Sequence, residues 1–389
     1  MVPREPGLPP GPVSVALLLP LSGPSAALGR AMLDAAQLAL FDVGVDKFVL
    51  LPKDTAGLPD GAARAAEAAI RDGASLILGP LFSGSVGAVV PLAEAAGIKV
   101  IAFSSDRNAA RPGVYLMGFL PDQQVERVVG FARERGYGRF AALAPASHYG
   151  ETVVRELRRV AQATGAELVD SVFYPADVRA ASDVSDIIRV FADFDARRQR
   201  LLAQRRALEA RDDEVSREAL RRLEGLDTLG DLAYDAVLLP EGGLRLLTVA
   251  PLLPYYDAGR DKVRLLGTAQ WETAALDQEP ALVGGWYAAP PPEARRGFES
   301  RFAELFGHAP PRLATLAYDA VALAGALARL PDGPDFSAET LTNAGGFRGL
   351  DGLFRFAPDG TNERGLAVLE VTARGVVTVS PAPRSFAAF

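Results

Sequence analysis

The stretch VSVALLL-PLSGPSAALG-RAMLDAAQLALF, residues 13–41, decides the fold class of this chain. Its first part, Val13–Leu19, is apolar at every position except Ser14, which is typical of a strand buried on both faces of a parallel sheet. A loop of small residues follows at 20–29, and the helical spacing of apolar residues over 30–41 predicts an amphipathic helix. The stretch is therefore a strand–loop–helix unit.

The same alternation continues along the chain and restarts after about residue 120. The first series predicts further strands at Phe48–Leu51, Leu76–Leu78, Val100–Phe103 and Val114–Met117. The second series predicts strands at Phe140–Leu143, Glu167–Phe173, Ala236–Leu239, Val263–Gly267 and Gly285–Ala288, followed by β-rich sequence from Gly352 onward. Strands joined by helices through short connections favour parallel sheets with both faces covered. We therefore expect an α/β protein with two Rossmann-like parallel-sheet lobes.

The amino-acid composition argues against several classes of function. The chain has 389 residues, of which 49% are hydrophobic and 23% charged, as in folded proteins of two or three domains. Its formal charge of −7 argues against a nucleic-acid partner, because phosphate binding needs a surplus of Lys and Arg. No apolar run approaches the roughly 20 residues that cross a bilayer. The absence of Cys and the presence of two His weigh against metal sites and His-based catalysis.

Two segments stand apart from this alternation. Residues 1–12 form a leader with five prolines, which fits either a cytoplasmic protein or an exported protein whose signal has been removed. Residues 195–227 form a charged insertion whose sparse apolar stripe predicts a protruding helix or helical hairpin. The insertion carries nine arginines: Arg197, Arg198, Arg200, Arg205, Arg206, Arg211, Arg217, Arg221 and Arg222. It is either a solvated surface element or a docking surface for another protein.

Hydroxyl side chains recur in the loops that follow the strands of the first lobe. These candidates are Ser22, Ser83, Ser85, Ser104 and Ser105. Ligands collect at the carboxyl ends of parallel strands, where helix N-termini present free N–H groups, so these serines could hold a carboxylate. Serine is also a favoured helix N-cap, which leaves a structural role open for each one. Asp122, at the start of a later helix, either complements the helix dipole or accepts an ammonium group.

Sequence signatures of catalysis are weak. The loop Gly79–Ser85 resembles a phosphate loop except that Ser85 stands where such a loop needs Lys. His148 stands at a helix start, where capping or lining a cleft explains it. The acids Glu241 and Glu272 lack a supporting partner that would make them a catalytic pair. We expect no enzymatic activity, no metal and no cofactor.

Taken in order, these loops resemble the type I periplasmic binding proteins, especially the leucine/isoleucine/valine receptors. The matching motifs are Leu17–Pro24, Leu76–Pro80 with Ser83, Val100–Ser105, Gly118–Gln124 and His148–Glu151. The resemblance implies two lobes with a hinge of three crossings, near Leu120–Asp122, Tyr287–Pro290 and Gly349–Leu353. The expected N-lobe is 13–121 with 289–350, and the expected C-lobe is 122–288 with 351–389. A small, amino-acid-like molecule would bind in the cleft between the lobes.

The resemblance also assigns roles to individual residues. Ser83, Ser85, Ser104 and Ser105 would hold the carboxylate of the ligand, and Asp122 would hold its amino group. Tyr149 corresponds to the aromatic residue of the second lobe. The second lobe departs from the receptors at Glu241, where they often place another aromatic residue. Our remaining candidates for ligand contact in the second lobe are Glu241, Gln270 and Trp271.

A narrower resemblance is to the LpoA-type lipoproteins that activate class A penicillin-binding proteins. It rests on Asp227–Pro240, Pro251–Tyr256, Leu316–Ala320 and Gly349–Phe354, together with the Arg-rich insertion. Our leading hypothesis is therefore an exported, periplasmic and lipid-tethered protein that acts by recognising a partner, the cell-wall synthase. The alternative is a solute receptor that delivers amino acids or related molecules to the permease of an ABC importer.

Overall fold

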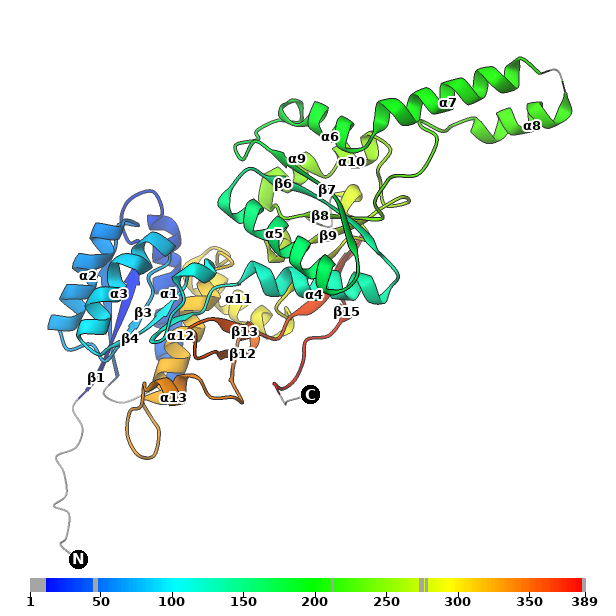
Figure 1. The fold of residues 1–389 in the computed structure, drawn as a ribbon. Coiled ribbons are helices and arrows are strands. Elements are labelled where there is room, and N and C mark those ends of the chain that lie inside the picture. The colour runs from blue at the N-terminus through cyan, green and yellow to red at the C-terminus, as the bar shows by residue number, and fades with distance from the viewer. Residues whose placement is uncertain (1–11, 45–47, 212, 273–275, 277–278, 387–389) are drawn as a thin grey trace, which may run out of the picture. The chain divides into compact units, whose positions relative to one another are not determined.

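The structure, a computed structural model, describes residues 12–44, 48–211, 213–272, 276 and 279–386. The chain divides into two compact units (Figure 1). Unit 1 consists of Met1–Leu120, Pro290–Gly365 and Ala382–Phe389, and unit 2 consists of Pro121–Ala289 and Leu366–Pro381. Each unit contains its own sheet with helices on both faces, as the strand–helix alternation predicted.

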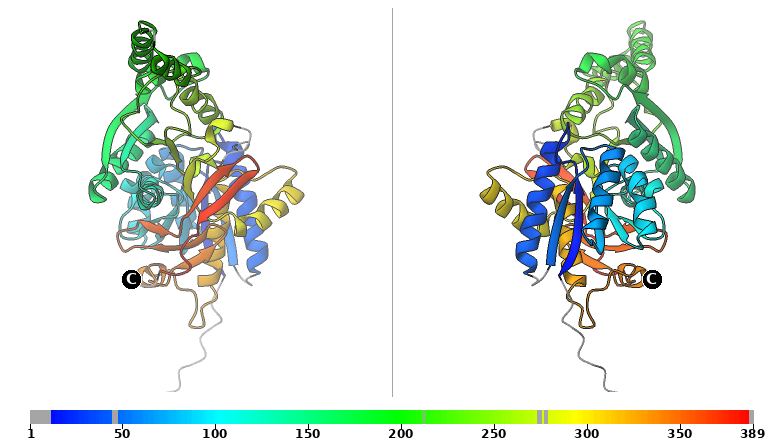
Figure 2. Two further views of the ribbon diagram at one scale, coloured as in Figure 1. Left: turned by 90° about the vertical axis from the view of Figure 1, so that its right-hand side faces the viewer. Right: turned by 90° about the vertical axis from the view of Figure 1, so that its left-hand side faces the viewer.

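The sheet of unit 1 is parallel, with strand order β2-β1-β3-β4-β5. Its strands are β1 (Val13–Leu19), β2 (Phe48–Asp54), β3 (Leu76–Leu78), β4 (Lys99–Ala102) and β5 (Val114–Leu116). Its main helices are α1 (Ala26–Val43), α2 (Pro59–Arg71), α3 (Ser83–Ala95), α11 (Glu293–Phe306), α12 (Ala314–Leu327) and α13 (Ala338–Leu341). Figure 2 shows strands β1 and β2 with α1 on one side of the sheet and α2 and α3 on the other.

The packing of strand β1 explains why its sequence is apolar at every position from Val15 to Leu19. Val15, Leu17 and Leu19 pack into one hydrophobic cluster with α1 and α12. The alternate residues, Ala16 and Leu18, pack into a second cluster with α2 and α3. Because side chains of a strand alternate between the two faces, a strand covered on both faces needs an apolar residue everywhere.

A small antiparallel sheet also belongs to unit 1, so the boundary between the two units differs from the predicted one. Strands β11 (Phe347–Gly349), β12 (Gly352–Phe356) and β13 (Asn362–Arg364) pair in that order. This pairing places the segment up to Gly365 in unit 1. The sequence analysis predicted a crossing between the lobes near 349–353 and assigned all residues after 350 to the other lobe. A further passage between the units follows Pro381.

Unit 2 has a mixed sheet with strand order β15-β14-β10-β9-β8-β6-β7. Its strands are β6 (Arg139–Pro145), β7 (Glu167–Tyr174), β8 (Ala236–Leu239), β9 (Arg264–Gly267), β10 (Trp286–Ala289), β14 (Ala367–Thr372) and β15 (Gly375–Ser380). The strands β7, β6, β8, β9 and β10 run parallel, and β14 joins β10 in the antiparallel sense. Its larger helices are α4 (Pro121–Glu134), α5 (His148–Ala163), α6 (Ser185–Phe191), α9 (Gly243–Val249) and α10 (Leu252–Tyr255).

The charged insertion forms a helical hairpin that extends from unit 2 (Figure 1). Helix α7 (Phe194–Glu209) and helix α8 (Glu214–Leu223) pack side by side, and we call this pair the arm. Leu201 and Leu208 of the predicted stripe are buried, whereas Val215 is exposed on α8. At the base of the arm the fully buried Arg197 donates hydrogen bonds to the carbonyl oxygens of Ala192, Gly230 and Asp257 and to the Asp257 carboxylate.

Candidate ligand-binding site

In unit 1 the five candidate serines all lie at or just beyond the carboxyl ends of the parallel strands. Ser22 follows β1, Ser83 and Ser85 open α3 after β3, and Ser104 and Ser105 follow β4. Since parallel strands end on the same edge of the sheet, the fold brings these loops to one edge, where α-helices also begin. Ser85 and Ser104 are buried, Ser83 is half-buried, and Ser22 and Ser105 are exposed.

The Ser85 hydroxyl is the most informative atom of this edge. Ser85 is 1% exposed, and its Oγ has no hydrogen-bond partner among the described residues. A buried hydroxyl without a partner costs free energy, so a hydrogen bond from this group to a ligand or a water molecule is favourable. It lies in the first turn of α3, where backbone N–H groups have no intrahelical acceptor. The N-cap residue of α3 is Phe82, and no side-chain hydrogen bond caps this helix among the described residues, so Ser85 is not its cap.

Ser104 is held in a different way. Its Oγ accepts a hydrogen bond from the backbone N–H of Asp106 at 3.1 Å, which is a local turn. The backbone of the neighbouring loop comes very close, because a Cβ added at Gly118 would lie 2.3 Å from the carbonyl oxygen of Ser104. The loops after β4 and β5 are therefore packed against each other by their backbones, and only glycine fits at 118.

Asp54 organises the first loop, and the sequence analysis missed it. Its Oδ1 accepts hydrogen bonds from the backbone N–H groups of Leu21 (2.8 Å), Ser22 (3.1 Å) and Ala56 (2.8 Å). Burial raises the pKa of Asp54, but the Ser22 side chain and these backbone donors outweigh it and hold the pKa below its ordinary value. Ser22 thus stabilises the loop by hydrogen bonding to the Asp54 carboxylate. An acid directly after a strand, opposite a small-residue loop, is the signal that could have revealed it.

In unit 2 the loops after β6 and β9 are joined by side chains. The Tyr149 hydroxyl lies 2.9 Å from the Thr268 hydroxyl, and the Gln124 side-chain oxygen accepts the Ala269 N–H at 2.7 Å. Burial, with a further contribution from the Glu241 carboxylate, raises the pKa of Tyr149 to about 12, so the phenol stays protonated at neutral pH. Thr268 and Gln124 were not predicted, because a single Thr or Gln after a strand carries no distinctive pattern.

Glu241 is a buried carboxylate at the end of β8. It is 4% exposed, accepts a hydrogen bond from the Tyr174 hydroxyl at 3.1 Å, and accepts one from the Gly242 N–H at 3.0 Å. Arg245 forms an ion pair with it at 3.1 Å. Burial and the Glu241 charge raise the pKa of Tyr174 strongly. The residue that replaces the receptors' aromatic side chain is therefore an anchored negative charge.

Of the remaining predicted ligand-binding residues of unit 2, some are buried and one is exposed. Trp271 is fully buried, and its indole N–H donates to the Leu239 carbonyl oxygen at 3.0 Å. A Cβ added at Gly267 would lie 2.2 Å from its ring, so Trp271 packs directly on the end of β9 and supports the loop from within. Gln270 is exposed in that loop. Asp122 lies in the first turn of α4 and is 8% exposed.

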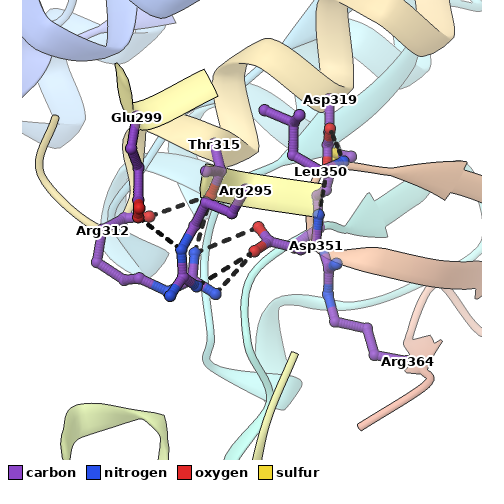
Figure 3. A network of polar contacts seen from close by, with 9 residues as sticks. Arg295, Glu299, Arg312, Thr315, Asp319, Leu350, Asp351 and Arg364 are labelled. Atoms are coloured by element: carbon purple, nitrogen blue, oxygen red, sulfur yellow. Dashed lines mark hydrogen bonds and ion pairs between the residues drawn. The ribbon is translucent and has the colours of Figure 1, made fainter. Parts of the chain in front are cut away.

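Two motifs that the sequence linked to a partner role form a buried polar network in unit 1 (Figure 3). The Asp319 carboxylate accepts the backbone N–H groups of Leu350 (2.7 Å) and Asp351 (3.4 Å). The fully buried Asp351 pairs with Arg312 at 2.8 Å. Burial and the neighbouring Asp351 raise the pKa of Asp319. A Cβ at Gly349 would lie 2.3 Å from the Asp319 carboxylate, so these residues fix a tight turn before β12.

Comparisons with known proteins agree with this architecture. A family model described as "Periplasmic binding protein" matches residues 12–196. An uncharacterized protein of Rickettsia prowazekii (strain Madrid E) is 23% identical over 188 residues, which are 46% of this chain and 50% of that protein. The chain thus matches about half the length of this relative.

Solved structures resemble the chain over nearly all of its length. A putative branched-chain amino acid ABC transporter protein from Rhodospirillum rubrum has a TM-score of 0.72 at 19% identity, covering 95% of this chain and 100% of that one. A benzoate-bound solute binding protein from R. palustris has a TM-score of 0.65 at 17% identity, with 96% and 97% covered. An isoleucine-bound substrate binding protein from Streptococcus pneumoniae has a TM-score of 0.62 at 16% identity, with 95% and 100% covered.

This chain has the α/β fold of the type I periplasmic binding proteins, with two sheet-containing units. The predicted resemblance to the leucine/isoleucine/valine receptors is confirmed at the level of the fold, and the matched family model covers residues 12–196. Within the described residues, no helix has the length and apolar character needed to cross a membrane.

Proposed function

We propose that this protein is a periplasmic receptor for a small carboxylate-bearing molecule, which the loops at the carboxyl ends of its strands recognise. The single observation that carries the proposal is the buried hydroxyl of Ser85 at the start of α3, which has no hydrogen-bond partner among the residues that the structure describes. A helix N-terminus favours an anion, and a hydroxyl beside it can donate one more hydrogen bond to a carboxylate. Among the similar structures, one is a complex with isoleucine and one is a complex with benzoate, and both molecules carry a carboxylate.

Unit 2 presents polar and aromatic side chains of its own beside the ends of its strands. Asp122 and Glu241 are carboxylates at the corresponding ends of α4 and β8, and they favour a positively charged group. Tyr149 adds an aromatic face whose hydroxyl is held by Thr268. These carboxylates of unit 2 favour the ammonium group that an amino acid carries and that benzoate lacks. They are our reason for an amino-acid-like ligand.

Titration calorimetry with leucine, isoleucine, valine and benzoate tests the receptor function. We expect at least one amino acid to bind, and we expect Ser85→Ala to weaken binding about tenfold by removing one hydrogen bond to the carboxylate. Asp122→Asn should weaken the amino acids and leave benzoate unchanged. Ser75→Ala is the matched control, because Ser75 is exposed and directly precedes β3, at the end of that strand opposite to the one that leads to α3. An affinity that is equal in Ser85→Ala and the wild type would contradict the proposal.

A second candidate function, activation of a class A penicillin-binding protein by direct contact, is favoured by the arm. Helices α7 and α8 extend from unit 2 on a buried Arg197 anchor, and Arg206 and Arg211 are exposed on α7 and beyond its end. The five arginines and two acids of α7 give it a charge of +3 in a chain whose total is −7. A positive, protruding element on a negative protein suits contact with an acidic protein surface.

Surface plasmon resonance against the class A penicillin-binding protein of the same organism tests this second function. We expect binding that weakens as salt is raised and that is lost in the double variant Arg206→Glu with Arg211→Glu. Arg155→Glu with Arg158→Glu, on helix α5 of the same unit, is the control for a nonspecific loss of positive charge. Absence of binding by the full chain at low salt would overturn the activator function and leave the receptor function standing.

A further inference from the structure

A second surface of unit 1 is built for contact and lies on different elements from the ligand loops. Near the C-terminal end of α1 and the end of α11 there is a groove of about 450 Å³, lined by Gln37, Leu38, Phe41, Arg301, Glu304, Leu305 and Phe306. Two of these residues are large apolar side chains that solvent reaches freely: Phe41 is 81% exposed and Leu305 is 62% exposed. Two such residues on one concave patch are unusual for a protein surface without a partner.

The groove is held rigid from beneath and from its end. Under it, Leu38 packs in a cluster with Phe298 and Phe302 of α11. At its end, Arg301 makes two hydrogen bonds to the carboxylate of Asp42, at 2.8 and 2.9 Å, which tie α11 to α1. Because Asp42 follows Phe41 directly, this bidentate pair fixes the backbone that presents the Phe41 ring to solvent. The exposed ring is therefore a fixed feature of the surface.

We propose that this groove is the interface between two copies of the chain, with Phe41 of each copy packed into the groove of the other. A two-fold interface needs a surface that is complementary to itself, and here a protruding ring stands beside an apolar hollow on the same patch. The charges obey the same requirement. Arg301 and Glu304 are three residues apart on α11, so a two-fold axis that crosses two antiparallel α11 helices sets Glu304 of each copy near Arg301 of the other.

The charge balance favours a second copy over an acidic or basic partner. The lining residues carry one positive and one negative charge, so the patch has no net attraction for a strongly charged surface. Each whole chain carries −7, and two copies repel one another at long range. An interface held by apolar contact against that repulsion should tighten as salt screens the net charge, whereas a charge-driven contact should weaken. The patch is small, so we expect a weak dimer that forms only at high concentration.

Sedimentation equilibrium on the full chain, from about 1 to about 200 µM and at two salt concentrations, tests this interface. We expect the average mass to rise from one chain toward two with concentration, and to rise further at the higher salt. Phe41→Asp should raise the dissociation constant by about tenfold or more, because it puts an unpaired charge into the apolar contact. Leu244→Asp is the matched control, since Leu244 is 83% exposed on α9 of unit 2.

Three outcomes would overturn the proposal. The first is a single-chain mass for the wild type over the whole concentration range. The second is a dimer that Phe41→Asp leaves unchanged while circular dichroism reports a folded variant. The third is a dimer that appears only after residues 1–11 are deleted, since the groove would then be occupied by the chain's own leader. None of these outcomes depends on whether a small molecule binds at Ser85.

Discussion

At the scale of the residue, ligand recognition and folding stability make opposite demands on Ser85. A hydroxyl that is buried without a partner is a cost in the unliganded protein and a donor once a ligand arrives. The side chains of Ser104 and Asp54, by contrast, accept hydrogen bonds from backbone N–H groups of nearby loops. Among the described residues, this edge of unit 1 therefore combines polar side chains that already bind the backbone with a buried Ser85 hydroxyl that has no hydrogen-bond partner.

Substitution of Ser85 separates these two demands. In Ser85→Ala we expect the free energy of unfolding, measured by urea denaturation without ligand, to stay equal or to rise by up to about 1 kcal/mol. Ser104→Ala should instead lose about 1 kcal/mol, because the Asp106 N–H loses its acceptor. A Ser85→Ala protein that is less stable than the wild type would assign the hydroxyl a structural role.

Glycine 79 shows how close the backbones of this edge lie. Its φ is +91°, and an added Cβ would lie 2.3 Å from the carbonyl oxygen of Leu18. Gly79→Ala should therefore cost about 3 kcal/mol or more in thermal or urea unfolding, from the combined backbone and steric strain. Gly97→Ala, with φ +70° and open space around it, isolates the backbone part and should cost about 1 kcal/mol. Equal losses in the two variants would mean that the loop relaxes around the new methyl group.

At the scale of the element, the arm depends on one buried cation. Arg197 is fully buried and pairs with Asp257 at 3.0 Å, and Thr228 and Lys262 also contact that carboxylate. Arg197→Met should lower the free energy of unfolding by about 3 kcal/mol, since it leaves a partly buried carboxylate and several carbonyl groups without this donor. Hydrogen exchange should rise along α7 and α8 while the strands of unit 2 stay protected. Unchanged exchange in the arm would show that its anchor lies elsewhere.

The same pair has a pH signature. Burial raises the pKa of Asp257, but Lys262, Thr228 and Arg197 outweigh it and hold the pKa below the ordinary value of 3.8. An acid whose pKa is lowered in the folded state contributes stability above its unfolded pKa and loses that contribution as the pH falls through the folded pKa. The stability gap between wild type and Arg197→Met should thus be full at pH 7 and should narrow below about pH 4. A gap that widens in acid would contradict this assignment of charges.

The elements themselves were largely predictable, for a physical reason. A strand covered on both faces must be apolar throughout, so β1 and β8 could be recognised from their sequence alone. The segment 347–364 was harder, because strand pairing decides which unit it joins and pairing is a long-range property. The motif around Asp319 looked functional in sequence, yet its carboxylate caps a turn whose backbone lies 31 residues further along the chain.

The candidate site was predictable only in outline. The position of the serines after β3 and β4 follows from the fold, but nothing local distinguishes the orphaned Ser85 from the satisfied Ser104. Trp271 could not be assigned either, because its burial depends on two glycines, Gly267 and Gly285, that leave room for its ring. Asp54 and Thr268 were missed for the same reason: their partners, Leu21 and Tyr149, lie far away in the sequence.

At the scale of the whole molecule, we propose that the fold serves to recognise a small carboxylate. A charged arm and a separate apolar groove then give the chain two further surfaces for protein contact. The three surfaces use different elements, so ligand binding, partner binding and self-association should respond to different substitutions. In particular, Phe41→Asp should leave calorimetric ligand affinity unchanged within about twofold, because additivity holds for residues that share no partners.

The most direct test of the central claim is a crystal structure of the protein bound to the tightest-binding amino acid from the calorimetric panel. We predict a carboxylate oxygen of that ligand within hydrogen-bond distance of the Ser85 Oγ, near the N-terminus of α3. A ligand bound with its carboxylate elsewhere, and with the Ser85 hydroxyl still without a partner, would contradict the account.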